Sequence, residues 1–600
     1  MSKRPYEHLP LPVPALFDPG EEDPLYFYNN FLRHFILDTI EIVNTGLHVD
    51  SKAVEKLRLT IDEVLKSVSK RLERNPLIKQ YQEKRTEKLQ QQHKEKCTAK
   101  TRRKSHYVDS YNEKNIQHRT WVVNTYLEGE KLNSYKQDKW TVKALREVNI
   151  FLQSSFLVSV IDKSVKPDNE RIKAGMEKLA EYKLELWNRP RYDKANTAVI
   201  VPNFNPGSAV QNQELFKLLK VEPLAFSKDT GNASWGRDQI EELLRASTDE
   251  DLVDLLEAIV DHSYGGIIKS TFLTAFDKFT VDGVLYGNIR LFGAKSMRNT
   301  SNSPNLLNTP STGSIYAKPL KNCFIAPEGF VIYAVDFNGL EDRVIANLSG
   351  DENKIAVFTE NLDGHSLAAT YYFKERLQAL IGEYSDNKEA SKLLKALVDS
   401  DDPIAAAVRQ DGKPVSFGLA YGAFPPKVAQ SIKCALEEAE RIFGVYHNEL
   451  FPGITKYREE YVLNTARKQG YLHLGLGCRI YTEDPDKEIR SISNATVQFW
   501  SILTLIAINE FNYRKKEKGL SGDVFVHATI YDSVYLYVRK DPEVLKWVND
   551  ALVEIMQKDF MEGQVVPNDA IGEVGNSWGV LTKVPQNAST EEIEEILEKL

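Results

Sequence analysis

Cysteine is scarce in this 600-residue sequence, and none of its cysteines forms a CxxC pair. The four that occur stand singly: Cys97, Cys323, Cys434 and Cys478. This argues against a disulfide framework or a zinc site and predicts reduced thiols in a cytoplasm-like compartment. Long apolar runs are missing too, since none approaches the roughly eighteen residues of a membrane span, and the first residues lead into no signal-peptide core. We therefore expect a cytoplasmic protein without membrane association.

Positive charge is not in excess either. The formal net charge is −8, with 77 Lys and Arg against 85 Asp and Glu. This excludes a uniformly basic coat for nucleic acid, but not a basic groove, because distribution matters more than the sum. With 42% hydrophobic and 27% charged residues, the chain has the composition of a large globular protein and the length of several domains.

Residues 331–343 hold the first candidate for chemistry. The run 330–335 is β-branched and aromatic and predicts a buried strand, and Asp336 stands where the run stops. Apolar residues then recur at helical spacing from Leu340 to Leu348. A carboxylate held at the end of a core strand suits a hard cation such as Mg²⁺. The alternative is that Asp336 only caps the following helix.

A second carboxylate lies far along the chain. Residues 524–538 predict two strands joined by the turn Tyr531-Asp532-Ser533, which would place Asp532 at the tip of a hairpin. Most turn aspartates are structural. Paired with Asp336, however, Asp532 could help to hold two cations about 4 Å apart for in-line phosphoryl transfer.

A third stretch supplies positive charge. Arg409, Lys413, Phe417 and Tyr421 are spaced by four, which on a helix makes one stripe of two cations followed by two rings. Cations fit a triphosphate, and flat rings fit a base or a sugar. The alternative is an amphipathic helix with one solvated and one buried end.

These stretches together resemble the family A DNA polymerases, the bacterial polymerase I type. Asp336-x4-Glu341-x-Arg343 resembles motif A of that family, the stripe from Arg409 to Gly422 resembles motif B, and Asp532 stands where motif C would place its aspartate. Further matches follow in family order: Arg298 with Ser303-Pro-Asn-Leu-Leu-Asn308, Asp363-Gly-His365, Arg490-x3-Asn494-x3-Gln498, and Gly575-x2-Trp578. The likeness runs from about 203 to 579, with a fainter match at 46–65.

The resemblance implies an α+β multidomain fold, a right-hand polymerase with a palm of antiparallel sheet and helices, helical fingers and a helical thumb. The expected parts are an N-terminal segment 1–58, a thumb region 59–290 with a large insertion at about 66–190, a first palm part 291–350, fingers 351–461, and a second palm part 462–600.

The resemblance also implies roles for the matching positions. Two Mg²⁺ ions, which Mn²⁺ can replace, would be bound by Asp336, Asp532 and the backbone carbonyl of Phe337, and the catalytic residues would be Asp336, Asp532 and Lys413. The nucleotide would be bound by Arg409, Lys413, Phe417, Tyr421, Glu341 and His365. The DNA would be bound by Arg298, Asn305, Asn308, Arg490, Asn494, Gln498 and Tyr531. Glu341 would block a ribose 2′-hydroxyl, and Phe417 implies discrimination against dideoxynucleotides.

The sequence departs from the family pattern in three ways. Motif C usually reads His-Asp-Glu, whereas here Tyr531 and Ser533 flank the aspartate. Gly412 and Pro414 are expected to interrupt the motif B helix, because proline removes a hydrogen bond and disfavours helical geometry at the preceding residue. The roughly forty residues before Thr45 leave no room for a proofreading exonuclease domain.

We therefore predict a DNA-templated DNA polymerase without its own 3′→5′ exonuclease, with a phage-like role in genome replication in the host cytoplasm. The expected partners are primer–template DNA and dNTPs, with a separate exonuclease, a helicase–primase and a processivity factor as further candidates. One alternative is a single-subunit RNA polymerase, which Glu341 and the Phe417-Gly pattern disfavour. Another is a DNA-binding subunit that has lost catalysis, which the intact carboxylates and cations disfavour.

Two charged segments complete the prediction. Residues 84–104 carry nine Lys and Arg against two Glu, which favours phosphate contact over a merely solvated face. Residues 589–600 predict an acidic C-terminal helix that begins with the capping box Ser589-Thr-Glu-Glu592. Its apolar stripe, 593–600, would pack either on the chain's own palm or inserted region, or in the groove of an accessory protein.

Overall fold

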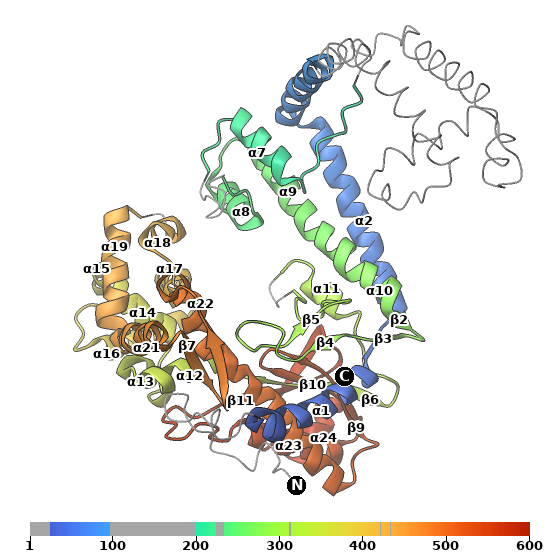
Figure 1. Ribbon diagram of the computed structural model, residues 1–600, viewed down its shortest axis with the longest axis vertical. Coiled ribbons are helices and arrows are strands. Elements are labelled where there is room, and N and C mark those ends of the chain that lie inside the picture. Colours follow the sequence, from blue (N-terminus) through green and yellow to red (C-terminus); the bar gives the residue numbers. More distant parts are fainter. Residues whose placement is uncertain (1–24, 96–198, 224–232, 311–313, 421, 433) are drawn as a thin grey trace, which may run out of the picture. The chain divides into compact units, whose positions relative to one another are not determined.

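The computed structural model (Figure 1) describes residues 25–95, 199–223, 233–310, 314–420, 422–432 and 434–600. The chain divides into two compact units. The first joins Met1–Val68 to Val260–Leu600, and the second is Ser69–Ile259. Most of the expected insertion at about 66–190 lies outside the described residues, as do Tyr421 and the end of the basic run, 96–104.

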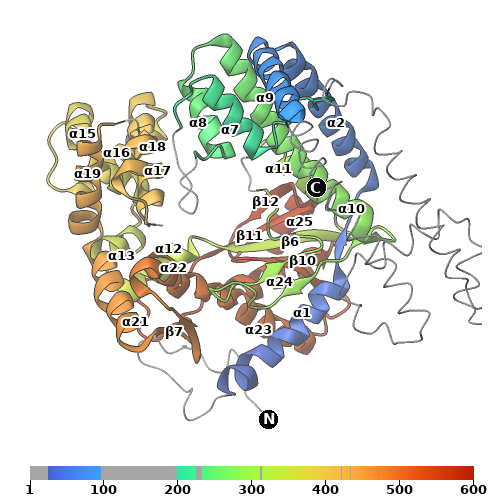
Figure 2. The same ribbon diagram turned by 45° about the horizontal axis from the view of Figure 1, so that its top comes forward.

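A five-stranded antiparallel sheet forms the centre of the first unit (Figure 2). In spatial order its strands are β12 (Val580–Val584), β11 (Ala570–Ser577), β6 (Phe330–Phe337), β10 (Ser533–Arg539) and β9 (Val524–Ile530). Strand β6 is the central strand of the sheet. Its side chains are buried on both faces of the sheet over most of its length, as expected for a central strand. The sheet brings together residues almost 200 positions apart, as the sequence predicted for the two strand regions.

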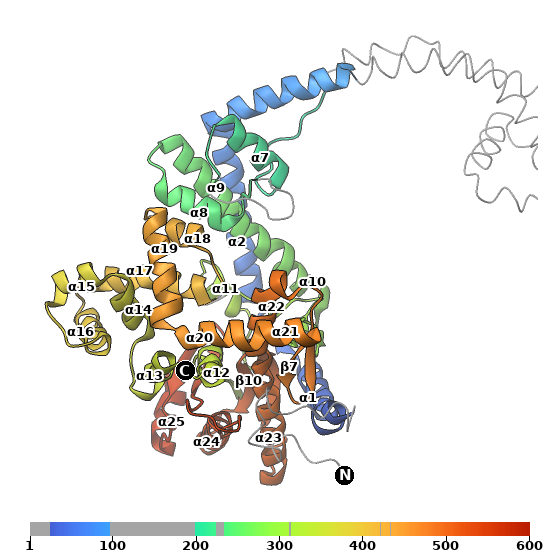
Figure 3. The same cartoon turned by 60° about the vertical axis from the view of Figure 1, so that its left-hand side comes forward.

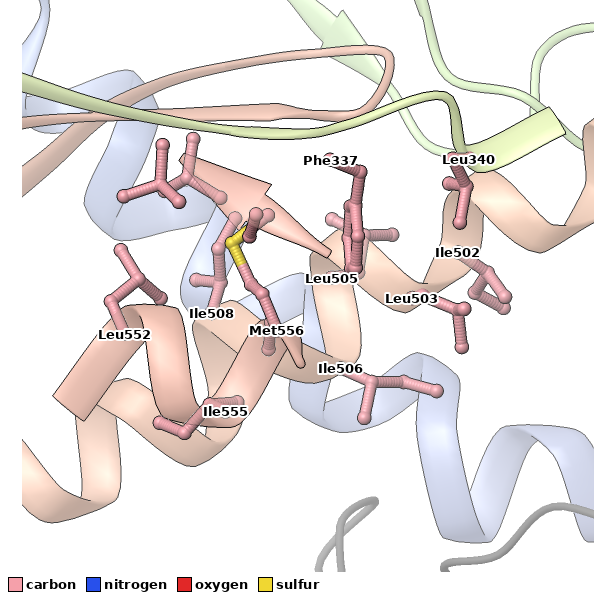
Figure 4. Close-up of a cluster of buried hydrophobic side chains, with 14 of the residues drawn as sticks. Phe337, Leu340, Ile502, Leu503, Leu505, Ile506, Ile508, Leu552, Ile555 and Met556 are labelled. Atoms are coloured by element: carbon pink, nitrogen blue, oxygen red, sulfur yellow. The ribbon is translucent and has the colours of Figure 1, made fainter. Parts of the chain in front are cut away.

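The two faces of the sheet differ. Val331, Val335 and Phe337 of β6 belong to the largest hydrophobic core, which also contains α1 (Arg33–Thr45), α23 (Ile502–Lys518) and α24 (Pro542–Met556). Figure 4 shows Phe337 and Leu340 facing apolar side chains of α23 and α24. Because side chains alternate along a strand, Asp336 lies on the opposite face. The Asp336 side chain is exposed, because the hydrophobic core on that face of the sheet does not extend to the end of β6.

The longest apolar helical stretch among the described residues is Pro485–Lys518, which includes α22 (Pro485–Gln498) and α23. By length and composition alone it could cross a membrane, with a mean hydropathy of 1.4 in its most apolar window. However, 72% of that window is buried inside the structure. Trp500, Leu503 and Ile506 pack in the core behind the sheet, so the apolar character is that of a core helix.

A helical lobe with a hydrophobic core of its own follows β6 and α12 (Leu340–Ser349). Figure 1 shows its helices in yellow and orange, α13 to α19. Their bounds are α13 (Glu352–Thr359), α14 (Gly364–Tyr372), α15 (Lys374–Ile381), α16 (Asn387–Asp399), α17 (Pro403–Ala420), α18 (Pro425–Ile432) and α19 (Leu436–Val445). The chain returns to the sheet through α20 (Pro452–Lys456), α21 (Asn464–Gln469) and the hairpin of β7 (Tyr471–Gly475) and β8 (Cys478–Tyr481).

Helix α17 corrects the prediction that Gly412 and Pro414 interrupt it, because it is continuous through both residues. Gly412 is buried against α14, where the nearest atoms to a Cβ at this position would be the Ala369 methyl group at 3.4 Å and the His365 carbonyl oxygen at 3.5 Å. Proline removes one backbone hydrogen bond, but the close packing of α14 on α17 offsets that cost. Tertiary packing therefore outweighs the local preference.

The remaining elements of the first unit connect the N-terminus to the sheet. The helices α1 and α2 (Ser51–Arg74) are separated at Gly46, and the break contains β1 (Leu47–His48). The short elements between 268 and 321 are η4 (Ile268–Leu273), α10 (Thr274–Phe279), β2 (Thr280–Val281), β3 (Val284–Leu285), β4 (Ile289–Arg290), β5 (Thr300–Ser301) and α11 (Ala317–Lys321). They carry the chain from α2 and α9 (Glu250–Ile267) to β6.

The second unit is helical where it is described, with α7 (Ala209–Leu218), α8 (Arg237–Ala246), most of α9, and a helix that continues to residue 95. Two side chains of the basic run 84–104 form contacts within this unit. Lys88 pairs with Glu214 at 2.7 Å, and Arg85 donates to the Pro202 carbonyl oxygen at 3.0 Å. Lys88 thus joins this helix to α7 and Arg85 joins it to the irregular segment before α7, so phosphate contact by the run stays a prediction.

The acidic helix forms as α25 (Thr590–Glu598), with both hydrogen bonds of the predicted capping box. Ile593 and Leu597 are buried, and Ile596 and Leu600 pack against the core behind the sheet. Figure 3 shows α25 beside α24, which it contacts. The apolar stripe of α25 therefore packs on the core behind the chain's own central sheet. This is the first of the two predicted alternatives, packing within the chain.

Candidate active site

The two predicted carboxylates lie at one end of the central sheet, Asp336 on β6 and Asp532 in the turn between β9 and β10. Ser533, the first residue of β10, pairs with Asp336 of β6, and the Phe337 N–H donates to the Asp532 carbonyl oxygen at 3.2 Å. The Ser533 hydroxyl donates to Asp336 Oδ1 at 2.5 Å. Gly339, and not Asp336, caps α12, with a left-handed φ of 70°. The interpretation of Asp336 as a mere helix cap is therefore wrong.

The charges of the two acids oppose each other. Burial raises the pKa of Asp532 to about 6, helped by the nearby charges of Asp336 and Glu341, while Arg298 opposes the rise. Burial also raises the pKa of Asp336, because the surrounding protein displaces water even though part of the side chain is exposed. The hydrogen bond from the Ser533 hydroxyl opposes that rise. Two carboxylates held this close by the backbone are stabilised in their ionised form by a cation.

Arg298 and Glu341 form an ion pair beside the carboxylates. Arg298 lies in the loop after β4, and its guanidinium carbon is 5.3 Å from the centre of the Tyr531 ring. Glu341 lies in the first turn of α12, where a negative charge is favoured by the helix dipole. Tyr531 has a φ of 55° and is 42% exposed, so the altered motif C presents an accessible ring next to Asp532.

A cleft of about 550 Å³ opens over this group. Its walls come from the end of the sheet, α12, the end of α17, and α22. The lining residues that the sequence had singled out are Arg298, Glu341, Asn494, Tyr531 and Asp532. Those that it had missed include Asp342, Lys354, Tyr446, Tyr457, Arg458 and Ser493. Their only sequence signal is proximity to a motif or to its neighbouring helix.

Arg458 is the most distinctive of the missed residues. Burial lowers the pKa of its guanidinium, and repulsion from Arg490 adds to the decrease. The Nη2 of Arg458 donates to the Ala420 carbonyl oxygen at 3.2 Å. Ala420 is the last residue of α17, and the helix dipole favours a cation at that end. Its Nε is buried and has no hydrogen-bond partner among the described residues. Arg458 therefore links the end of α17 to the floor of the cleft.

A second group of predicted residues lies in the helical lobe. Arg409 is paired with Asp363 by two hydrogen bonds, Nε to Oδ1 at 2.9 Å and Nη2 to Oδ2 at 2.8 Å. The Lys413 side chain is exposed and forms no ion pair with any described residue. Burial lowers the pKa of His365, and the charges of Arg409 and Lys413 contribute to the decrease, so the ring is neutral near pH 7. These three residues do not line the cleft.

The structure divides the predicted DNA-binding residues. Asn494 lines the cleft, and Arg490 and Gln498 lie on the same face of α22, one turn before and one turn after it. Asn305 and Asn308 lie in a loop that is anchored by buried Leu306 and contributes no residue to the cleft. The ring of Phe417 and the whole of Tyr421 lie outside the described residues.

The donor set fits divalent cations that prefer oxygen. Among the described residues no cluster of three or more His, Cys, Asp or Glu could hold a metal by itself, so the candidate consists of Asp336 and Asp532 with backbone oxygens. Mg²⁺ is commonly bound by one or two carboxylates together with substrate phosphates and water. The raised pKa of Asp532 fits the same reading, since a cation would relieve the repulsion from Asp336.

Comparison with known proteins places these features in one family. The family model for DNA polymerase family A matches residues 176–580. The thermostable DNA polymerase I of Thermus thermophilus is 27% identical over 295 residues, which is 49% of this chain and 31% of that protein. DNA polymerase I of Chloroflexus aurantiacus is 28% identical over 389 residues, or 63% of this chain and 37% of that protein. The chain thus matches about a third of the length of these relatives.

A solved structure shares the fold. It is the POL domain of Pol1 from M. smegmatis in complex with DNA primer-template and dNTP, with a TM-score of 0.51 and 22% sequence identity. The match covers 63% of this chain and 62% of that one. The fold is thus that of the polymerase right hand, as predicted from the sequence, while the predicted domain boundaries stay predictions. On the extent of the family match, the chain belongs to DNA polymerase family A.

Proposed function

We propose that this chain is a DNA-templated DNA polymerase that adds deoxynucleotides to a primer 3′ end by two-metal-ion phosphoryl transfer. The observation that carries the proposal is the pair Asp336 and Asp532, held side by side by the register of β6 and β10 at the edge of a cleft. Membership of the family and the fold shared with a DNA- and dNTP-bound POL domain support it.

Asp336, Asp532 and the backbone carbonyl of Phe337 would hold the two ions, Mg²⁺ or Mn²⁺. When bound, the ions would activate the primer 3′-hydroxyl and stabilise the leaving pyrophosphate. The Asp532 carboxylate must be ionised for this role, and with a pKa of about 6 it is ionised above neutral pH. The Ser533 hydroxyl donates to Asp336 Oδ1 and so fixes the orientation of that carboxylate.

The helical lobe would hold the triphosphate. Lys413 is an exposed ammonium without an ion pair among the described residues, which suits a phosphate contact and catalysis by charge stabilisation. Arg409 and neutral His365 would assist it, the first as a fixed cation and the second as a hydrogen-bonding ring. Phe417 and Tyr421 would complete the nucleotide site.

Primer–template DNA would lie along α22 and the hairpin tip. Arg490, Asn494 and Gln498 form one face of that helix, and Tyr531 would replace the usual histidine next to the primer terminus. Arg298 would contact the duplex or fix Glu341 through their ion pair. Asn305 and Asn308 would reach the DNA only through their own loop.

Primer extension is the decisive experiment. With Mg²⁺ and a primer–template, we expect dNTPs to be added and rNTPs to be rejected, and we expect no extension after chelation. Preferential use of rNTPs would favour an RNA polymerase instead. DNA binding without any extension would favour the DNA-binding subunit that has lost catalysis.

Glu341→Ala tests the basis of sugar selection. We expect the preference for dNTPs over rNTPs to fall by about tenfold or more, because shortening the side chain opens space beside the sugar C2′. Asp342→Ala is the matched control, since its carboxylate lies in the same helical turn and pairs with Lys354 instead. An unchanged ratio in Glu341→Ala would place the selection elsewhere.

We further propose that residues 1–600 carry no 3′→5′ exonuclease and that the enzyme replicates a phage genome in the host cytoplasm with separate accessory proteins. The motif C that departs from the family pattern and the modest identity to cellular polymerases support a divergent lineage. Incubation with a mismatched primer, Mg²⁺ and no nucleotide is the test. Primer shortening that a chelator stops would contradict the first part.

A further inference from the structure

We propose that Asp363 is a positioning residue for nucleotide binding, which holds the guanidinium of Arg409 in the orientation that receives the triphosphate. The inference rests on the proposed function, because it assumes that Arg409 contacts the nucleotide. The family match covers Asp363 but assigns it no role.

The first observation is the geometry of the pair. An arginine side chain has two edges that can each bind a carboxylate with two parallel hydrogen bonds. Asp363 occupies the edge formed by Nε and Nη2, at 2.9 and 2.8 Å. No described residue accepts a hydrogen bond from Nη1, so the donors of this nitrogen remain for a ligand. The contact fixes the plane of the guanidinium without using all of its donors.

The second observation is that Asp363 is itself immobile. It caps α14, because its Oδ1 accepts the backbone N–H of Ser366 at 2.7 Å. Although burial favours the neutral acid, hydrogen bonds from Arg409 and Ser366 lower the pKa of Asp363 to about 2. The carboxylate is therefore charged at every working pH. Helix α14 also packs closely on α17, so the two ends of the ion pair belong to one rigid pair of helices.

The third observation is the surrounding charge. Arg409 and Lys413 are one turn apart on α17, and both influence the titration of His365, which lies two residues after Asp363. The cap that starts α14 thus fixes Arg409 and places His365 on the same side of the lobe. Lys413 forms no ion pair with a carboxylate among the described residues. Of the two cations, only Arg409 is therefore held in one orientation before the nucleotide binds.

Presetting a long side chain has a measurable consequence. Immobilising a flexible side chain at binding lowers affinity, and this loss is avoided where the free protein already holds the chain in place. Releasing Arg409 should therefore weaken dNTP binding by about two- to tenfold. The rate of the chemical step should change little, because Asp363 does not contact the reacting atoms.

The experiment compares single-turnover primer extension by the full chain and by variants at a range of dNTP concentrations. Asp363→Asn keeps the shape of the side chain and can still cap α14, but it removes the charge. We expect its apparent Kd for dNTP to rise two- to tenfold with a maximal rate within about twofold of the wild type. Asp363→Ser, a shorter cap, should give the same result if Asp363→Asn fails to fold.

Two further variants separate positioning from stability. Asp386→Asn alters an equivalent helix cap, on α16, that binds no arginine, and should leave the apparent Kd unchanged. In an Arg409→Ala background, Asp363→Asn should have no further effect, because Asp363 acts through Arg409. An effect that persists in this background, or an unchanged Kd in the single variant, would overturn the proposal.

The remaining outcomes are also informative. A lower Kd in Asp363→Asn would overturn the proposal in favour of a carboxylate that competes with the triphosphate. If Arg409→Ala leaves the Kd unchanged, then the assumed nucleotide contact is wrong and the inference fails with it. Extension of primers with dNTPs by that same variant would show that the proposed polymerase activity itself survives.

Discussion

The carboxylates of the sheet and the cations of the helical lobe are positioned in different ways. Asp336 and Asp532 are fixed by backbone pairing between β6 and the β9–β10 hairpin, and burial, with the charge of Asp336 adding to it, raises the pKa of Asp532 to about 6. Arg409 and Lys413 project from a single helix, where one is held by an ion pair and the other is exposed. The register of a sheet can hold like charges close together. On a helix surface, each cation forms an ion pair only where a neighbouring element supplies an acid.

The difference has a functional reading. Under the proposed function, the carboxylates would hold metal ions and would have to keep their geometry through the reaction, which a sheet with a packed helical layer behind it favours. The cations would bind and release a triphosphate in each cycle, which side chains on a helix surface can do. The predictions below test each side of this comparison, beginning with the largest effect.

Asp532→Ala should remove the sheet's contribution to catalysis. We expect nucleotide addition to fall by at least about 10³-fold, because the carboxylate would hold ions that act on the transition state. DNA binding, measured by fluorescence anisotropy, should stay within about twofold. Asp523→Ala, at the other end of strand β9, is the control. Activity of Asp532→Ala within tenfold of the wild type would refute the two-metal assignment.

Lys413→Ala should show the contribution of the exposed cation. We expect kcat/KM for dNTP to fall by about 10²-fold, as is typical when one charge-stabilising group is removed. Lys392→Ala, which removes an exposed lysine from α16, should behave like the wild type. Equal kinetics for both variants would mean that the triphosphate binds elsewhere.

The layer behind the sheet should respond to pH through Asp38. This residue of α1 is buried and accepts hydrogen bonds from Asn509 and Asn512 of α23, at 2.8 and 2.9 Å. Burial raises its pKa from 3.8 to about 6, although these bonds oppose the rise. The folded state therefore holds a proton that the unfolded state releases between about pH 4 and 6. Stability from Asp38 is full below this window and is lost as the pH rises through it.

The expected loss is about 2–3 kcal/mol between pH 4 and 7. Urea midpoints of the wild type and of Asp38→Asn, measured across this range, isolate the contribution because Asp532 titrates in both proteins. Asp550→Asn, at an exposed position of α24, is the control. A pH dependence that is identical in the wild type and Asp38→Asn would show that burial does not shift this carboxyl.

Ile593→Ala should give the smallest effect, a loss of about 2 kcal/mol in unfolding free energy, because α25 packs at the margin of the core. Glu594→Ala, on the exposed face of the same helix, should change little. Primer extension should be preserved at 25 °C in both. Loss of a partner interaction with unchanged stability in Ile593→Ala would favour docking on an accessory protein over the observed packing.

Local patterns in the sequence were sufficient for much of the fold. The hydrophobic run at 330–335, the hairpin around Asp532 and the capping box at Ser589 are all set by interactions within a few residues. Strand alternation and helix caps depend on short-range geometry, which sequence spacing records directly. The resemblance then joined the separate motifs into one expected site, which stays a prediction, and the family match confirms the family itself.

Local reasoning was wrong where a distant contact decided the outcome. Helix α17 continues through Pro414, because Gly412 lets α14 pack close to the helix and this packing outweighs one missing hydrogen bond. The ion pair of Arg409 with Asp363 and the burial of Arg458 in the cleft join residues about 40 positions from their partners. Their spacing follows no helical or strand period, so no sequence pattern marks them.

The sequence by itself determined which residues are candidates for the chemistry, since it fixes the type of each residue and the spacing of carboxylates and cations along the chain. Only the tertiary structure decided how those residues affect one another. The raised pKa of Asp532 depends on water excluded by the whole sheet module and on the charge of Asp336, almost 200 residues away. Electrostatic energies depend on distance and on the surrounding medium, and both exist only once the chain has folded.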